Sequence, residues 1–339
     1  MADHEPNETG ADQRHTESIP IVIDADRAVS TLLSGGLVAL PTETVYGLAA
    51  RAADPDAVER VYAVKDRPRD HPLILHLADI TDLDSWAREI PDTAHRLAAA
   101  FWPGPLTVLL HRSERVSDII TGGRDTVAVR VPAHDLARRV IQGAGALVAP
   151  SANRFGRLSP TTATHVSDDL GAFLDARTDL ILDGGPCTIG VESTIVDCTR
   201  TPVEVLRPGG VSAEQIAGLL DEGVAAASGP SRASGMLISH YAPQARVVAA
   251  ADRAEALAVL EQCRAQGRTA ETIDLCDDLE RYARELYELL HDADRRGVDT
   301  VVAVLPDGSG LGAAIADRIT KAAADHGPES ATDRTSPTR

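Results

Sequence analysis

The chain has 339 residues, of which 43% are apolar, so it is long enough for two domains with separate cores. Its 51 acidic and 33 basic residues give a net charge of -18, which repels a phosphate backbone unless basic residues gather in one cleft. This balance argues against a protein that coats nucleic acid along its whole surface.

The cysteines also limit the class of protein. The four of them, at positions 187, 198, 263 and 276, form no C-x-x-C pair, which indicates neither a disulfide framework nor a zinc site. No apolar run approaches the roughly 20 residues of a membrane span, and residues 1–18 lack the apolar core of a signal peptide. We therefore expect a cytoplasmic protein without membrane association.

The first part of the chain predicts a large α/β domain. Residues 1–18 are polar and lack periodicity, as are residues 327–339 at the other end, so both are expected to be disordered tails. Between residues 19 and 220, short apolar runs alternate with helical patterns, which is typical of a sheet with flanking helices. Eight strands are expected, at 37–40, 73–77, 106–110, 126–131, 147–149, 180–182, 194–196 and 203–206.

The second part predicts a linker and a smaller domain. Residues 221–244 are rich in Gly, Ala, Ser and Pro, which is typical of a linker. Residues 245–326 contain three units in which an apolar run precedes a helical pattern, and such units favour a small parallel sheet. The strands are expected at 247–250, 272–275 and 301–305, and the helices at 252–266, 278–294 and 311–324.

Two polar segments follow apolar runs in the first half of the chain. Residues 41–48 (P-T-E-T-V-Y-G-L) place hydroxyl groups where the chain leaves a sheet, although a polar turn with a helix cap also fits. Lys65 and Arg67 lie two residues apart before Pro68, so in an extended segment they point the same way, as binding of a triphosphate requires. A solvated basic turn is the alternative, but 31 of the 33 basic residues are arginine, which makes a lysine at this position notable.

Three further segments carry polar groups. Residues 150–153 (P-S-A-N), together with Ser159 and Thr161, precede a helix and offer several groups for an anion, where a simple helix cap needs one hydroxyl. Residues 190–194 (G-V-E-S-T) precede an expected strand. Arg207 follows the next expected strand, where it fits either a ligand contact or a surface charge. Residues 240–243 (H-Y-A-P) lie at the end of the linker. They fit either a plain hinge or a segment whose aromatic ring covers a bound ligand.

In this order the five segments resemble the Sua5/YrdC/YciO family, in its longer type with an added C-terminal domain. The resemblance runs from about residue 19 to about 324, and residues 310–318 (G-L-G-A-A-I-A-D-R) are similar to that added domain. It implies a YrdC-like twisted mixed sheet with a central cleft, plus a small Rossmann-like domain. Residues 221–244 are then expected to be a linker that closes over the nucleotide as a lid.

The resemblance also implies an activity. It is the condensation of L-threonine, bicarbonate or CO2, and ATP into threonylcarbamoyl-AMP and pyrophosphate. The product serves the threonylcarbamoyladenosine modification at position 37 of tRNAs that decode ANN codons. ATP is a substrate, and Mg2+ accompanies it without a protein side chain as ligand, because no carboxylate cluster is evident. The implied partner is a downstream transferase complex that acts on tRNA, with direct tRNA binding weak or absent.

Site residues follow from the same resemblance. The threonine contacts fall on Thr44, His76, Arg130, Ala149 and Ser193, and Arg130 takes the carboxylate. Lys65 and Arg67 are expected to act in catalysis by neutralising phosphate charge. The ATP contacts fall on Lys65, Arg67, His71, Thr126, Ser151, Asn153, Ser159, Arg207 and Tyr241.

The chain departs from the family pattern in three places. His71 stands where the family often has Asn, Arg154 and Phe155 replace small residues, and residues 234–237 replace a linker start rich in Pro and basic residues. An RNA-binding module of the same fold is the alternative function, and the net charge argues against it. A carbamoyl-transferring relative from hydrogenase maturation would need zinc-finger cysteine clusters, which this sequence lacks.

Overall fold

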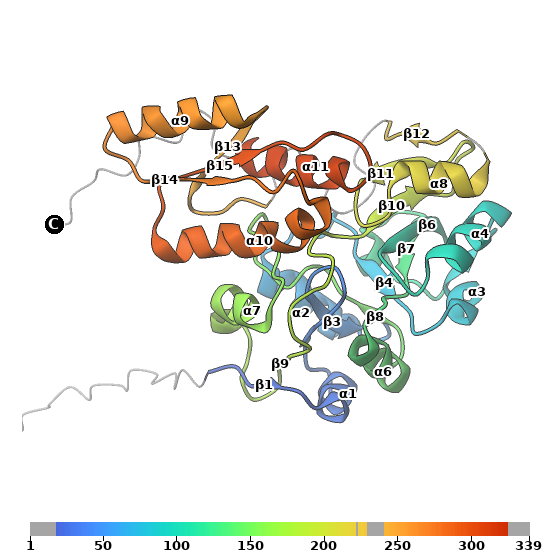
Figure 1. Ribbon diagram of the computed structural model, residues 1–339. Helices are drawn as coiled ribbons and strands as arrows, with labels where there is room; N and C mark the ends of the chain where they lie inside the picture. The colour runs from blue at the N-terminus through green and yellow to red at the C-terminus, as the bar shows by residue number, and fades with distance from the viewer. Residues whose placement is uncertain (1–17, 222, 229–240, 325–339) are drawn as a thin grey trace, which may run out of the picture.

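The computed structural model describes residues 18–221, 223–228 and 241–324, and the statements below concern these ranges. The tails expected at 1–18 and 327–339 lie outside them apart from Ser18, as do His240 and most of the expected linker. The described part consists of a large unit and a smaller C-terminal unit, which lies against it on one side (Figure 1). No helix in these ranges is long and apolar enough to cross a membrane.

The large unit is a mixed sheet between helices. Its 12 described strands follow the order β1-β9-β2-β3-β8-β4-β7-β6-β10-β11-β12, with β5 beside β6. The pairs β4–β7 and β2–β9 are parallel, whereas β3–β8 and β6–β7 are antiparallel. The strands are β1 (Ile21–Val22), β2 (Val38–Leu40), β3 (Gly47–Arg51), β4 (Ile74–His76), β5 (Ala87–Arg88), β6 (Leu106–Arg112), β7 (Thr126–Arg130), β8 (Leu147–Val148), β9 (Leu180–Leu182), β10 (Thr194–Asp197), β11 (Glu204–Arg207) and β12 (Ala225–Ala226).

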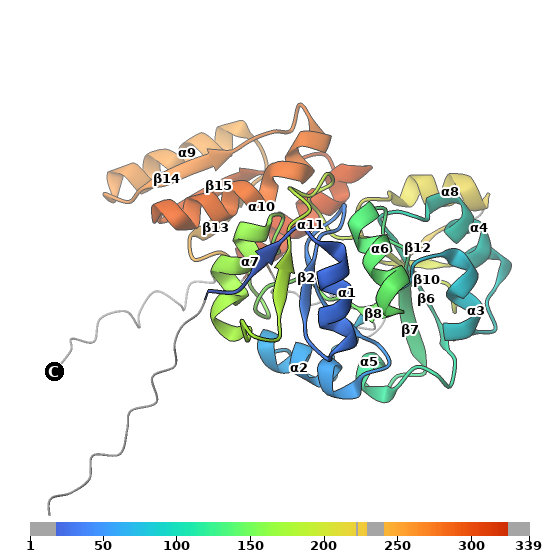
Figure 2. The same cartoon turned by 90° about the horizontal axis from the view of Figure 1, so that it is seen from below.

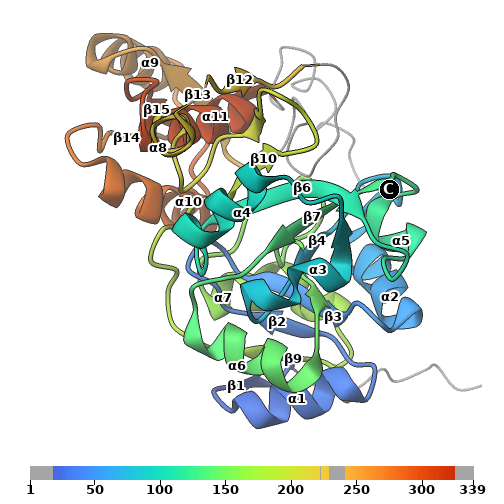
Figure 3. The ribbon, with the colours of Figure 1, turned by 90° about the vertical axis from the view of Figure 1, so that its right-hand side faces the viewer.

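Side chains alternate between the two faces of this sheet, as the strand repeat of two requires. Val38 and Leu40 belong to the core under α1 and α6, which lie side by side (Figure 2). Leu37 and Ala39 belong to the larger core under the helices of the opposite face, where α4 packs against β6 and α8 (Figure 3). The helices are α1 (Ala25–Leu33), α2 (Pro55–Lys65), α3 (Leu83–Trp86), α4 (Asp92–Phe101), α5 (Asp118–Thr121), α6 (Asp135–Ala144), α7 (Ala163–Leu170) and α8 (Ala213–Leu220), with short 3₁₀ turns η1 (Ile80–Asp82) and η2 (Gly171–Phe173).

All eight strands expected in this unit are present, but the described sheet also contains β1, β3, β5 and β12. Three of these have only two residues, which is too short for a periodic pattern in the sequence. The strand β3 begins at Gly47, inside the segment interpreted as a turn, and β12 lies inside the segment interpreted as a linker. Tertiary pairing with β2 and β11 makes these residues strands.

The C-terminal unit matches the three predicted strand–helix pairs. Its parallel sheet has the order β13-β15-β14, and α9 covers the face opposite to α10 and α11 (Figure 1). The helices α10 and α11 face the large unit. The elements are β13 (Arg246–Ala250), α9 (Arg253–Ala265), β14 (Ala270–Ile273), α10 (Leu279–Arg296), β15 (Thr300–Val304) and α11 (Leu311–Ala324).

Candidate active site

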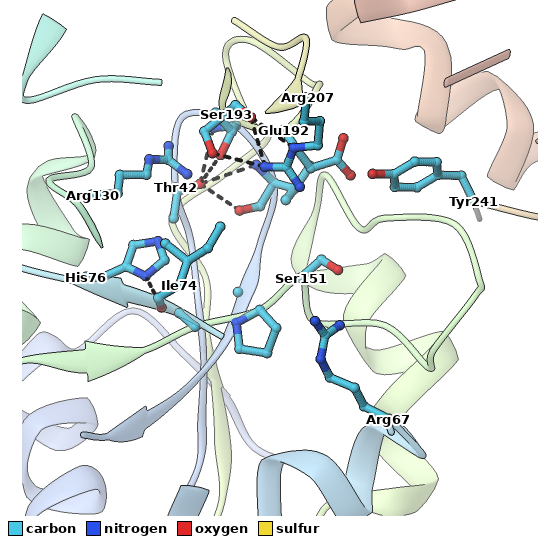
Figure 4. Close-up of a pocket in the computed structure, with 15 residues that line it drawn as sticks. Thr42, Arg67, Ile74, His76, Arg130, Ser151, Glu192, Ser193, Arg207 and Tyr241 are labelled. Carbon is cyan, nitrogen blue, oxygen red and sulfur yellow. Dashed lines mark hydrogen bonds between the residues drawn. The ribbon is translucent and has the colours of Figure 1, made fainter. Parts of the chain in front are cut away.

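A cleft opens in the large unit next to the C-terminal unit (Figure 4). All five residues predicted to contact threonine line it, together with four of the residues predicted to contact ATP: Arg67, Ser151, Arg207 and Tyr241. The complete lining is Thr42, Thr44, Val45, Gly47, Arg67, Ile74, His76, Arg130, Ala149, Pro150, Ser151, Glu192, Ser193, Arg207 and Tyr241.

The cleft has two ends. His76 and Arg130 end the neighbouring parallel strands β4 and β7, where they are paired in register, so both side chains reach the same region. Arg67 and Tyr241 lie on the opposite side, with Ser151 between the two ends (Figure 4). Because the arginines stand at both ends, the cleft suits a ligand with anionic groups some distance apart.

Thr44 is held with its hydroxyl oxygen available as an acceptor. The Thr42 hydroxyl donates to the carbonyl of Val45 at 2.6 Å, so its oxygen accepts from the Thr44 hydroxyl at 2.9 Å. Backbone N–H groups of Thr44 and Val45 also donate to Thr42 Oγ1, both at 3.2 Å. With its own proton used, Thr44 Oγ1 has lone pairs for a donor such as an ammonium group.

His76 is a neutral acceptor in this structure. Its Nδ1 lies 3.1 Å from the carbonyl oxygen of Ile74, which only accepts, so Nδ1 carries the proton and Nε2 has the lone pair. Burial, reinforced by the nearby charge of Arg130, lowers the pKa of His76 to about 3. A ring with this pKa orients a donor but is too weak a base to remove a proton at neutral pH.

Arg130 is buried and oriented by two contacts. Its Nε donates to the carbonyl of Gly104 at 3.1 Å, and its Nη2 lies 2.7 Å from Glu43 Oε1. The Nη2 and Oε1 atoms are close enough for an ion pair, but they are not aligned for a hydrogen bond. The Glu43 carboxylate therefore compensates the charge of the buried guanidinium without accepting two parallel hydrogen bonds from it.

Arg67 and Arg207 supply positive charge at the other end. Burial lowers the pKa of Arg67 to about 10, which leaves it protonated at neutral pH. Arg207 donates through Nε and Nη2 to the carbonyl of Ser193 at 3.1 and 2.8 Å, and through Nη2 to Ser193 Oγ at 3.1 Å. The Ser193 hydroxyl is also 2.8 Å from Thr107 Oγ1, so its position is fixed from two sides.

Lys65, Asn153 and Ser159 lie behind the lining of the cleft. Lys65 ends α2, which begins after the capping residue Asp54, and its Nζ donates to the carbonyls of Ser151 and Asn153, both at 2.5 Å. Burial, together with the charge of Arg67, holds the pKa of Lys65 well below its usual range. Ser159 donates to Glu192 Oε1 at 2.5 Å. The helix cap is Thr162, which accepts from the N–H of His165 at 3.2 Å, so neither Ser159 nor Thr161 caps α7.

His71 and Thr126, also predicted to contact ATP, are absent from the lining. Thr126 begins β7 and pairs with His111 on β6. The ring of His71 meets the Phe155 ring edge-on at 5.1 Å, and the Arg67 guanidinium lies 5.7 Å from the same Phe155 ring. Two of the three departures from the family pattern, at His71 and Phe155, thus contact each other, and both contact Arg67.

The lining also contains residues that were not predicted as contacts. Thr42 and Glu192 lie inside the polar segments 41–48 and 190–194, but the sequence predicts no contact for either side chain. Glu192 has a pKa of about 2, because the charges of Arg318 and Arg207 and a hydrogen bond from Ser159 outweigh the effect of its burial. Nothing local in the sequence indicated that Arg318, more than 100 residues away, is its partner.

The described residues contain no group of three or more His, Cys, Asp or Glu side chains placed to hold a metal ion. Among the described residues that line the cleft, only Glu192 has a carboxylate group. This carboxylate already forms an ion pair with Arg318. The residues of the cleft therefore do not fit a metal bound by protein side chains.

Comparisons with known proteins agree with this architecture. A family model described as Telomere recombination (Sua5_yciO_yrdC) matches residues 30–209, and a model described as Threonylcarbamoyl-AMP synthase, C-terminal domain, matches residues 211–324. A threonylcarbamoyl-AMP synthase from Pyrococcus abyssi is 41% identical, covering 87% of this chain and 92% of the relative. One from Bacillus subtilis is 38% identical, covering 88% and 92%.

Solved structures give the same result. The P. abyssi Sua5 structure complexed with L-threonine has a TM-score of 0.84 and 40% identity, covering 90% of this chain and 97% of the other. A double variant of the same archaeal protein has a TM-score of 0.83 with 38% identity, covering 90% and 96%. The large twisted mixed sheet, the small Rossmann-like unit and both family models agree, so the chain belongs to the Sua5/YrdC/YciO family, in its form with a C-terminal Sua5 domain.

Proposed function

We propose that this chain is an enzyme that makes L-threonylcarbamoyladenylate from L-threonine, bicarbonate or CO2, and ATP, with release of pyrophosphate. The observation that carries the proposal is that Thr44, His76, Arg130, Ala149 and Ser193 line one cleft. The chain that contains this cleft is 35–41% identical over most of its length to proteins named threonylcarbamoyl-AMP synthase.

The end of the cleft with Arg130 and His76 suits an amino acid. A guanidinium binds a carboxylate through two parallel hydrogen bonds, which assigns the substrate carboxylate to Arg130. Thr44 Oγ1 and His76 Nε2 are acceptors, so they face the amine and the side-chain hydroxyl of threonine. The neutral ring of His76 avoids repulsion with the substrate ammonium group.

The reaction forms two bonds. Bicarbonate supplies CO2 by losing hydroxide, and the threonine ammonium group loses a proton to water to become an amine. The amine nitrogen attacks the carbon of CO2, and a second proton passes from nitrogen to water to give a carbamate. A carbamate oxygen then attacks the α-phosphorus of ATP, and the bond from this phosphorus to the bridging oxygen of pyrophosphate breaks. Neither step needs a protein nucleophile, so the enzyme acts by in-line positioning, by charge compensation and by exclusion of water.

The end with Arg67, Arg207 and Tyr241 is proposed for ATP, together with Ser151 in the middle of the cleft. Arg67 and Arg207 compensate phosphate charge, and Tyr241 contacts the nucleotide. Lys65, Asn153 and Ser159 support this end from behind through the contacts described above. His71 and Thr126 remain predicted contacts. We propose that Mg2+ arrives with the triphosphate and is held by phosphate oxygens and water.

The wider role is proposed as well. We place the catalytic domain at residues 19–220 and the C-terminal domain at 245–326, with 221–244 as linker and lid; residues 222 and 229–240 lie outside the described residues. The adenylate passes in the cytoplasm to a transferase complex that modifies position 37 of ANN-decoding tRNAs. The net charge of -18 favours weak or absent direct tRNA binding by this chain.

Pyrophosphate release measured with ATP, bicarbonate and one amino acid at a time tests this activity. We expect release with threonine and at least about a hundredfold less with valine. Valine has the same shape as threonine but lacks the hydroxyl group that is proposed to form a hydrogen bond in the site. Serine separates the role of the methyl group from that of the hydroxyl. Release that does not depend on threonine, or tight sequence-independent RNA binding without ATP turnover, would refute the proposed function.

A further inference from the structure

The Glu192 carboxylate joins the cleft to the C-terminal unit. Glu192 lines the cleft and is only 5% exposed. Its Oε2 accepts from Arg318 Nε at 2.6 Å, and both of its oxygens lie 3.2 Å from the Tyr287 hydroxyl. Tyr287 is on α10 and Arg318 on α11, so the partners of this carboxylate come from both helices that face the large unit.

Arg318 touches two more segments beside the cleft. Its Nη2 donates to the carbonyl of Pro208 at 3.1 Å, directly after Arg207 in the chain. Its guanidinium carbon lies 5.2 Å from the centre of the Tyr241 ring. Tyr241 has φ of 68°, a left-handed backbone that bulky residues rarely adopt without support from their surroundings. One side chain thus contacts Glu192, the residue after Arg207, and Tyr241.

These contacts reach the part of the cleft proposed for ATP. Glu192 lies between Arg207 and Tyr241 (Figure 4). Arg207 in turn is bound to the carbonyl and hydroxyl of Ser193, the residue after Glu192. The position of the Arg207 guanidinium therefore depends on its own segment and on that of Ser193. Arg318 binds the adjacent residue in each segment, Pro208 in the first and Glu192 in the second.

The charges explain why this site needs an arginine. Arg318 is 1% exposed, and a buried carboxylate without a cation is strongly unfavourable. The positive charges of Arg318 and Arg207 keep Glu192 ionised despite its burial, with a pKa of about 2. A lysine supplies the charge but not the planar set of donors that reaches Glu192 and Pro208 at once.

We propose that Arg318 is a positioning residue which the C-terminal unit contributes to the ATP end of the cleft. By binding Glu192 and Pro208 together, it sets the orientation of Arg207 and supports Tyr241, without touching the reacting atoms. The assignment rests on the proposed function, and it makes the C-terminal unit part of the nucleotide site.

Steady-state kinetics of the full chain with Arg318→Met and Arg318→Lys test this role, since methionine removes the charge while keeping much of the volume. We expect kcat/KM for ATP to fall at least about tenfold in Arg318→Met, with a clearly smaller fall for threonine, because the displaced groups lie at the ATP end. Arg318→Lys should be intermediate. Arg281→Met is the matched control, because Arg281 is a half-exposed arginine of the same unit that pairs with Glu285.

A double variant distinguishes positioning from simple structural support. In Arg318→Met/Glu192→Gln the carboxylate is neutral and no longer needs a cation, so part of the ATP-specific loss should be recovered, by about threefold or more relative to Arg318→Met. Arg318 variants with unchanged kinetics, or with equal losses for both substrates and no recovery in the double variant, would overturn the inference. If the unmodified chain itself shows no threonine-dependent pyrophosphate release, the proposed function fails instead.

Discussion

At the scale of single residues, the cleft combines groups whose protonation differs because their surroundings differ. His76 is neutral with a pKa of about 3, whereas Arg67 keeps its charge with a pKa of about 10, although both are buried. Burial opposes charge in both cases, but the guanidinium starts from a much higher intrinsic pKa. The end of the cleft proposed for threonine therefore contains a neutral acceptor, and the end proposed for ATP contains permanent cations.

Replacing Arg130 by lysine tests the carboxylate contact. Lysine cannot reproduce two parallel hydrogen bonds, so Arg130→Lys should raise the KM for threonine by about tenfold or more and change that for ATP much less. Initial rates at varied threonine and ATP give both values. Equal effects on the two substrates would instead assign Arg130 to a structural ion pair with Glu43, from which it is separated by 2.7 Å.

The structure changes what is expected of Lys65. From the sequence, Lys65→Ala is expected to lower turnover at least about a hundredfold without affecting folding. In the structure Nζ binds two backbone carbonyls, so the variant should also lose about 2 kcal/mol or more of unfolding free energy, because buried acceptors lose their donor. Urea unfolding and kinetics measure both, with the exposed Arg69→Ala as control. A variant that keeps more than roughly a third of wild-type kcat/KM would identify Lys65 as a dispensable basic residue.

His76 should make the protein sensitive to acid. The folded state keeps the ring neutral down to about pH 3, while the unfolded chain protonates it near its ordinary value of 6.5. Between these values the unfolded chain binds the extra proton, so stability falls as the pH is lowered from 6.5 towards 3. In His76→Gln the slope of unfolding free energy against pH should decrease by up to about 1.4 kcal/mol per pH unit in this window.

At the scale of elements, the site depends on how closely the segment before β10 approaches the end of β11. Gly209 follows β11, and a Cβ atom there would lie 2.3 Å from the carbonyl oxygen of Glu192 and from the N atom of Thr194. Both neighbours are backbone atoms and cannot move aside easily. This close approach brings Arg207 to Ser193, so the absence of a side chain at position 209 is a requirement of the site.

Gly209→Ala tests this packing. We expect a loss of about 1–3 kcal/mol in unfolding free energy, as for other overpacked sites, and at least about a tenfold fall in kcat/KM. Gly218→Ala is the matched control, because a Cβ atom at this position of α8 meets nothing within 4 Å. It should stabilise the helix by up to about 1 kcal/mol. Similar effects of the two substitutions would mean that the contact at Gly209 relaxes without consequence.

At the scale of the whole molecule, the two units share a hydrophobic core. Val45, Leu158 and Val191 of the large unit pack in one cluster with residues of α10 and α11, such as Leu286 and Ile315. The same interface contains the ion pair of Glu192 and Arg318. The C-terminal unit therefore covers both apolar and charged groups next to the cleft.

A chain that ends near residue 232 tests this dependence. The sheet of the large unit has its own core, so the shortened chain should keep most of its secondary structure by circular dichroism. It should lose most synthesis activity, because Glu192 loses Arg318 and Tyr241 is missing. Binding of a dye to exposed apolar surface should increase. Full activity in the shortened chain would show that the C-terminal unit is dispensable for catalysis.

The sequence predicts the fold class, eight of the twelve described strands of the large unit, the three βα units and the segments that form the cleft. These features depend on local patterns, namely apolar runs, helical periodicity and motif order, which are visible along the chain. The resemblance also predicted the residues at the threonine end, and their placement in one cleft agrees with it.

Only the folded structure reveals the strands β1, β3, β5 and β12, the position of Lys65 behind the cleft, the contact of His71 with Phe155, and the pairing of Glu192 with Arg318. Each depends on neighbours that are distant in sequence, 126 residues apart in the case of Glu192 and Arg318. A two-residue strand exists only through its pairing partner, and a buried charge only through its counter-charge. Local sequence patterns cannot predict such partners, because residues that are distant in sequence come into contact only when the chain has folded.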